Sequence, residues 1–373
     1  MALRKVFFWL HLTAGVLAGL VILVMCVTGT LLMYEKQVTR WADGYRRAPA
    51  AGATHLPIET LLAKVRETRS APPTSVMLEA DPTAPASLGY GREGTLFVDP
   101  YDGAVLGEGS TQARAFFRSV TDWHRWLSTE GDNRARGKAV TGAANLIFLF
   151  IVMSGFYLWW PRSWTWRSLR AVTWFQGGLP GKARDFNWHN VIGLWMAVPL
   201  FCVVLGGVVI SYPWATALVY RLTGSPPPDP PRRDAPSSAP ANELSLEGLN
   251  AAWAAAEGHV PAWQTLTLRV PGSADAPWTF AIDTSSTGAI RPDRRSQLTL
   301  DRKTGALVRH EAYESQSTGR KVRGWLRFIH TGEAFGLAGQ TVAGAASAGG
   351  CVLVYTGLAL SLRRFRSWRR RAV

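Results

Sequence analysis

Residues 8–34 read FWLHLTAGVLAGLVILVMCVTGTLLMY, and residues 186–212 read FNWHNVIGLWMAVPLFCVVLGGVVISY. Each stretch carries a histidine as its fourth residue, His11 in the first and His189 in the second. When the two histidines are aligned, two glycines and a closing tyrosine also coincide. Because a helix has ~3.6 residues per turn, the glycines four and eighteen residues after each histidine fall on nearly the same face. A titratable residue inside a membrane helix is a functional candidate.

Four stretches of the chain contain no Asp, Glu, Lys or Arg: residues 6–34, 139–160, 186–212 and 338–362. Each exceeds the ~20 apolar residues that a helix needs to cross a bilayer. The sequence therefore predicts an integral membrane α-helical protein with four transmembrane helices and both termini on the same side. The first stretch is longer than the ~7–15 residue core of a signal peptide, so we expect an uncleaved anchor.

Basic residues are concentrated at one side of these predicted spans. The chain before the first span, the loop 161–185 and the tail 363–373 carry thirteen Lys and Arg residues against one acid, Asp185, in a chain of net charge +15. The positive-inside rule places this side in the cytoplasm. Topology thus accounts for the charge, and we expect membrane lipid as a partner for the tail and no nucleic acid.

The two segments on the opposite side, 35–138 and 213–337, repeat one order of elements. Each is expected to hold a helix and several short strands, with an Asp-x-x-x-Gly turn near its end, and then a helix that carries a histidine. The strands are predicted at 75–79 and 94–99 in the first segment, and at 265–270, 278–283 and 297–301 in the second. The helices are predicted at 56–70, 111–127 with His124, 244–257 and 321–337 with His330, after a Pro-rich spacer at 224–241. The sequence therefore predicts two pseudo-symmetric repeats, each with a small α+β module between two spans.

Four of the seven histidines fall into two groups by depth. His11 and His189 open spans on the basic side, whereas His124 and His330 precede spans on the other side. A twofold arrangement would bring His11 opposite His189 and His124 opposite His330, which suits the two axial positions of a haem iron. Zinc usually takes about four protein ligands, often Cys or carboxylate, which the spans do not offer.

Basic residues near each group could meet haem propionates, although they could equally anchor lipid headgroups. They are Arg4, Lys5 and Arg184 near the first pair, and Arg118, Arg125, Arg323 and Arg327 near the second. All three cysteines lie inside spans, so no disulfide is expected in the outer segments. The G-x-G-x-x-G sequence at 89–94 leads into the strand predicted at 94–99 and not into a helix, so it does not indicate a dinucleotide-binding loop. An electron donor would have to be a separate molecule, either a quinol or a cytoplasmic reductase.

Motifs spread along the chain resemble those of the PepSY-associated transmembrane family, iron-regulated inner-membrane proteins that include ferric-siderophore reductases. They are Trp9-Leu10-His11, Trp123-His124-Arg125-Trp126, the segment SGFYLWWPR at 154–162, Asn187-Trp188-His189-Asn190 and Phe328-Ile329-His330-Thr331-Gly332. The resemblance implies two PepSY-like periplasmic modules on four spans of a bacterial inner membrane. It also implies two haems b, with axial ligands His11/His189 and His124/His330.

The activity that this resemblance implies is oxidoreductase chemistry, in which electrons cross the membrane and reduce a periplasmic ferric siderophore to release iron(II). No acid–base or nucleophilic catalytic residue is expected for that chemistry. The alternative is a non-enzymatic PepSY membrane protein that acts as a protease regulator, a sensor or a scaffold. A metal or siderophore permease is disfavoured because the spans contain no acidic residues.

Overall fold

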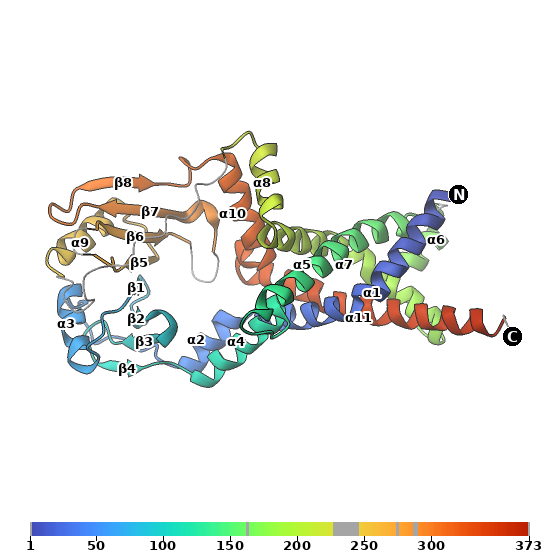
Figure 1. Cartoon of the computed structure of the whole chain (residues 1–373). Helices are drawn as coiled ribbons and strands as arrows, with labels where there is room; N and C mark the ends of the chain where they lie inside the picture. The colour runs from blue at the N-terminus through green and yellow to red at the C-terminus, as the bar shows by residue number, and fades with distance from the viewer. Residues whose placement is uncertain (1, 162–163, 227–245, 274–275, 286–289, 372–373) are drawn as a thin grey trace. The chain divides into compact units, whose positions relative to one another are not determined.

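The computed structural model describes residues 2–161, 164–226, 246–273, 276–285 and 290–371 (Figure 1). The chain forms two compact units. The helical unit comprises Met1–Glu35, Ala115–Val219 and Val322–Val373, and the sheet unit comprises Lys36–Arg114 and Tyr220–Lys321. Most of the Pro-rich spacer predicted at 224–241, the start of the helix predicted at 244–257, and Arg162 lie outside the described residues.

Four long helices make up most of the helical unit: α1 (Ala2–Leu32), α5 (Asn133–Trp159), α7 (Gly181–Ser211) and α11 (Gly336–Arg369). Among the described residues, these four are long and apolar enough to cross a membrane, which confirms the number and position of the predicted spans. Each helix begins before its charge-free stretch, and α11 also continues past the end of its stretch, because backbone hydrogen bonding continues where the side chains turn polar.

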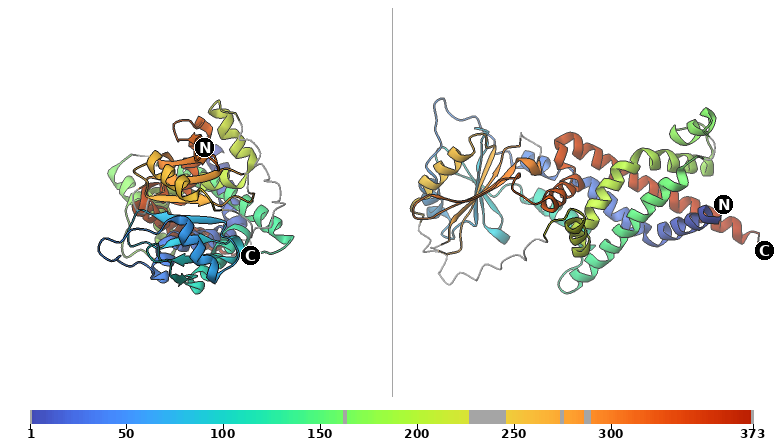
Figure 2. Two further views of the ribbon diagram at one scale, coloured as in Figure 1. Left: turned by 90° about the vertical axis from the view of Figure 1, so that its left-hand side faces the viewer. Right: turned by 90° about the horizontal axis from the view of Figure 1, so that it is seen from above.

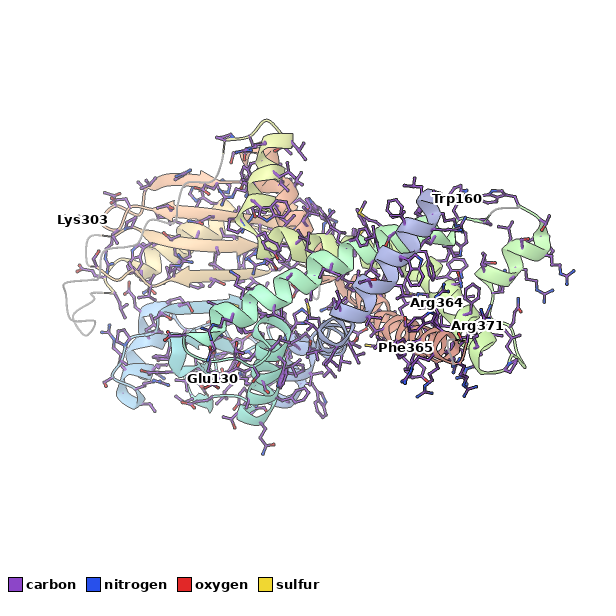
Figure 3. All side chains as sticks on the ribbon, turned by 45° about the vertical axis from the view of Figure 1, so that its right-hand side comes forward. Glu130, Trp160, Lys303, Arg364, Phe365 and Arg371 are labelled. Carbon is purple, nitrogen blue, oxygen red and sulfur yellow. The ribbon has the colours of Figure 1, made fainter. Side chains whose placement is uncertain are left out.

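The four spans pack as a square in which α1 and α7 are diagonal. Both α1 and α7 contact α5 and α11. Between them lies an apolar core that includes Ile22, Phe148 and Leu200. Both chain termini lie at one end of this bundle (Figures 1 and 2), and Trp160 and Arg364 lie at the same end (Figure 3). We call this the terminal end of the bundle.

Shorter helices accompany the spans. Those predicted at 111–127 and 321–337 are α4 (Thr111–Trp126) and α10 (Thr318–His330). The second prediction was too long at its carboxyl end, because Gly332 adopts a positive φ of 71° and a 3-10 turn, Glu333–Phe335, precedes α11. Three further helices had no sequence prediction: α2 (Glu35–Asp43), α6 (Trp166–Thr173) and α8 (Pro213–Leu222).

The sheet unit contains an eight-stranded antiparallel sheet with the order β4-β3-β2-β1-β5-β6-β7-β8 in the described part of the chain. Its strands are β1 (Ser75–Glu79), β2 (Ala86–Gly89), β3 (Thr95–Val98), β4 (Val105–Gly107), β5 (Thr265–Arg269), β6 (Trp278–Asp283), β7 (Arg295–Leu300) and β8 (Leu307–Glu311). The two predicted modules are thus halves of one sheet, since β1 pairs with β5 in the register Val76↔Leu268.

Helices α3 (Ile58–Thr68) and α9 (Leu249–His259) contact each other and pack on one sheet (Figure 2). Alternate residues of β1 and β5 are buried beneath them, as expected for a sheet with one covered face. The predicted Asp-x-x-x-Gly turns are present, with positive φ at Gly103 and Gly305. Strand β2 escaped prediction because Pro85 and Gly91 surround it, and these are turn residues.

Candidate functional site

The helical unit brings the four predicted histidines together as two pairs. The ring centroids of His11 and His189 are 6.4 Å apart, and those of His124 and His330 are also 6.4 Å apart. His11 lies on α1 and His189 on α7, so this pair meets across the diagonal of the bundle. We call these the terminal pair (His11/His189) and the distal pair (His124/His330). The other histidines, His55, His259 and His310, lie in the sheet unit.

A hydroxyl group contacts Nδ1 of three of these histidines. His11 Nδ1 lies 2.9 Å from Ser154 Oγ on α5, and His189 Nδ1 lies 2.9 Å from Thr356 Oγ1 on α11. In the distal pair, His124 Nδ1 lies 2.9 Å from Thr28 Oγ1 on α1. Each hydroxyl therefore joins a histidine to a neighbouring span.

The fourth histidine, His330, contacts a backbone carbonyl oxygen in place of a hydroxyl group. His330 Nδ1 lies 2.7 Å from the carbonyl oxygen of Val203 on α7. Helix α10 can approach α7 this closely because residue 206 is glycine: a Cβ there would lie 2.6 Å from the carbonyl oxygen of Leu326. Because the two helices are this close, His330 contacts the backbone of α7 directly and no hydroxyl side chain lies between them.

These contacts decide where the imidazole protons lie. A carbonyl oxygen can only accept, so Nδ1 of His330 carries the hydrogen and donates it to Val203. The three hydroxyls donate their own hydrogen to helix carbonyls: Ser154 to Ile151, Thr28 to Val24 and Thr356 to Val352. Their oxygens are then acceptors for Nδ1–H. In all four rings, Nε2 is consequently the nitrogen with a free lone pair.

A glycine lies against the edge of every one of these rings. A Cβ would lie 3.2 Å from His11 Cε1 at Gly155, 3.4 Å from His189 Cε1 at Gly357, 3.4 Å from His124 Cε1 at Gly29 and 3.2 Å from His330 Cε1 at Gly207. Three of these glycines directly follow the hydroxyl residue that contacts the same ring. The recurring hydroxyl–glycine pair therefore both orients the imidazole and makes room for it.

The distal pair is held neutral by its surroundings. Burial, together with the neighbouring His330, lowers the pKa of His124 to about 4. Burial also lowers the pKa of His330. The uncharged form is the one that coordinates a metal, so at neutral pH neither ring would have to lose a proton first.

The separation within each pair fits two imidazoles on opposite sides of one metal ion. A metal–nitrogen distance of about 2 Å, with each ring centre roughly 1.1 Å further away, places the two centroids roughly 6 to 6.5 Å apart. Each pair supplies two nitrogens, which is the number haem iron takes from a protein when the macrocycle provides the other four. Histidine ligands ordinarily donate their second ring nitrogen to a protein oxygen, as all four do here.

The two pairs lie at different levels of the bundle. Thr28, the contact of His124, follows His11 on α1 by seventeen residues, which corresponds to ~26 Å along a helix. Buried apolar residues of α1, including Ala18 and Ile22, separate the two levels. The sites are thus two separate centres within the same bundle.

Residues 8–364 match the family model of the PepSY-associated TM region. This chain belongs to the PepSY-associated transmembrane family. The match covers all four spans and both histidine pairs, and it confirms the family resemblance seen in the sequence motifs. A search of curated proteins found no match.

In this PepSY-associated chain, two of the three basic residues predicted near the terminal pair, Arg4 and Arg184, have protein partners. Arg4 donates to the carbonyl oxygen of Leu158. Arg184 lies 3.0 Å from Asp185, and Arg363 lies 2.8 Å from the other oxygen of that buried carboxylate. Arg364, visible in Figure 3, lies over the ring of Trp9. Near the distal pair, Arg125 lies over Trp126 and Arg327 over Phe328.

Sequence reasoning missed the residues that orient the histidines. It placed Gly29 and Gly207 on the histidine faces of their own helices, yet each contacts a histidine of the distal pair instead. Gly15 has no atom within 4 Å of a Cβ. The repeated Ser/Thr-Gly pairs are visible in the sequence. Which histidine each pair contacts depends on which helices pack together, and the sequence does not show that.

Proposed function

We propose that this protein is a haem b-dependent ferric-siderophore reductase of a bacterial inner membrane. Two haems are held by His11/His189 and by His124/His330. Both termini and the terminal pair are on the cytoplasmic side, and the sheet unit is periplasmic. The single observation that carries the proposal is the pair of matched histidine sites, each with its ring centroids 6.4 Å apart and its Nδ1 atoms engaged.

The protein's own groups prepare each site for a one-electron centre, which is the chemistry that bound haem supplies. The hydroxyls of Ser154, Thr28 and Thr356 and the carbonyl of Val203 hold a proton at Nδ1 of the four histidines and leave Nε2 free. The Nε2 atoms would hold a haem iron. The apolar core between the two levels excludes water and ions from the path between them. Electrons can then cross in two shorter stages rather than one.

The substrate step follows from the chemistry of the chelate. A ferric siderophore that accepts one electron becomes an iron(II) complex, which its hard oxygen donors hold less tightly, and the metal is released. This step needs no general acid or base from the protein. The two-repeat arrangement remains part of the proposal, supported by the palindromic order of the strands about the β1–β5 pairing and by the recurring hydroxyl–glycine pairs.

The activity can be tested without knowing the natural electron donor. Haem-loaded protein is reduced with dithionite, freed of excess reductant, and mixed without oxygen with hydroxamate and catecholate ferric siderophores, while ferrozine traps iron(II). We expect about one iron(II) per haem, because each centre stores one electron. His124→Ala should lose most of this transfer. Loaded protein that reduces none of the chelates would contradict the reductase assignment, and haem-free native protein would favour the non-enzymatic alternative.

A further inference from the structure

An apolar cavity lies on the outside of the bundle beside the terminal pair. Its volume is about 490 Å³, and its main lining residues are Phe175, Leu179, Arg184, Trp188 and Ile192. That volume falls in the range of small-molecule sites, ~300–1,000 Å³. The cavity belongs to neither histidine pair, since no histidine lines it.

Its position on α7 places it next to the redox site. Arg184, Trp188 and Ile192 are spaced by four residues and so share one face of the helix. Trp188 directly precedes His189, whose ring turns toward His11. One face of α7 therefore serves the histidine pair, and the adjacent face lines the cavity.

Hydrogen bonds fix residues 171–176, at one side of the cavity, to α7. The buried amide of Asn187 donates to the carbonyl oxygens of Ala171 and Trp174 at 3.0 and 3.1 Å, and it accepts from the backbone N–H of Gln176 at 3.0 Å. Trp195 Nε1 donates to the carbonyl of Thr173 at 2.9 Å. Because these bonds hold residues 171–176 against α7, the wall of the cavity is a defined part of the fold.

The chemistry of the lining selects an uncharged aromatic molecule. Phe175 and Trp188 meet edge to face at 6.3 Å, and together with Ile192 and Val352 they offer aromatic and aliphatic walls. Arg184 and Gln176 add hydrogen-bond donors to the lining. Arg184 is engaged with the protein through Asp185 at 3.0 Å, a carboxylate that also pairs with Arg363 at 2.8 Å.

We infer that this cavity binds a quinol, the electron donor for the terminal pair. This inference rests on the proposed function, because a donor is needed only if the histidine sites carry electrons. A quinol dissolves in the bilayer and reaches a cavity on the outer surface of membrane helices. Its oxidation breaks two O–H bonds, gives a quinone, releases two protons to water at the terminal end, and supplies one electron to each of two ferric chelates.

Photolabelling tests the site independently of haem. A short-chain azido-ubiquinone is irradiated with the full-length protein, and the label is located by mass spectrometry. We expect it within residues 171–192 and Val352, in the haem-loaded protein and equally in a His11→Ala/His189→Ala double variant. Ile192→Trp should lower the labelling about tenfold, which corresponds to ~1.4 kcal/mol of lost binding. The same change at an outward-facing site, Leu20→Trp, is the control.

Label spread evenly over the lipid-facing helices, or label equally strong in Ile192→Trp, would overturn the inference. Because a tryptophan at 192 could disturb packing against Gly349, Phe175→Ala provides a second variant at an exposed position, where we also expect weaker labelling. Decylubiquinol-driven reduction of the haem band separates the two proposals. If dithionite-reduced protein passes electrons to ferric siderophores but quinol does not reduce it, the quinol site is wrong and the reductase assignment stands.

Discussion

Three hydroxyl side chains set the protonation of the histidines that are proposed to bind haem iron. Thr356 accepts from His189 and Thr28 accepts from His124, and each hydroxyl hydrogen is used on a carbonyl one turn earlier in its own helix. No spacing rule in the sequence links Thr356 to His189. The histidines themselves could be predicted because a polar ring inside a charge-free span stands out, whereas a threonine in such a span does not.

Replacing one threonine should therefore weaken one haem site and spare the other. For Thr356→Val we expect a roughly 10- to 100-fold lower haem affinity at the terminal pair, the usual effect of losing an oxygen that orients a histidine ligand. Thr28→Val should do the same at the distal pair. Haem titration of the apoprotein measures both. Thr341→Val, which removes a hydroxyl bonded to Tyr34, is the matched control, and an equal loss in that variant would refute the orienting role.

At the scale of helices, glycines in the spans have different environments despite their similar spacing. A methyl group at Gly155 would lie 3.2 Å from the His11 ring, whereas at Gly15 it would meet nothing within 4 Å. Gly155→Ala should thus displace His11 and alter the low-spin signal of the terminal haem in electron paramagnetic resonance spectra. Gly15→Ala should leave that signal unchanged. Identical spectra for wild type and Gly155→Ala would show that the ring does not depend on this space.

The helices and strands were largely predictable, and their partners were not. Charge-free runs located the four spans, and alternating apolar residues located strands such as β1 and β6. The sequence did not reveal that β1 pairs with β5. A strand that pairs with another strand along its edge and a strand whose edge is exposed to water show the same alternation of apolar residues. For the same reason the two expected modules proved to be one sheet.

At the scale of the whole molecule, the distribution of charge predicts how the chain lies in the membrane. In single-cysteine variants with the native cysteines replaced by alanine, Lys303→Cys in the β7–β8 turn should react with an impermeant maleimide in spheroplasts. Ser367→Cys near the end of α11 should react only after lysis, because the positive-inside rule predicts that the basic side of the spans faces the cytoplasm. The opposite labelling pattern would reverse the proposed direction of electron flow.

Each histidine pair is proposed to hold its own haem, and the proposed electron transfer depends on both haems. The most direct measurement is a dithionite-reduced minus oxidised absorbance spectrum of the purified, haem-replete protein, with haem counted per chain. We predict a low-spin α-band from two haems, and loss of about half of it in His11→Ala and in His124→Ala, as expected for two bis-histidine sites. The absence of an α-band, or loss of the whole band in either single variant, would contradict the two-site account.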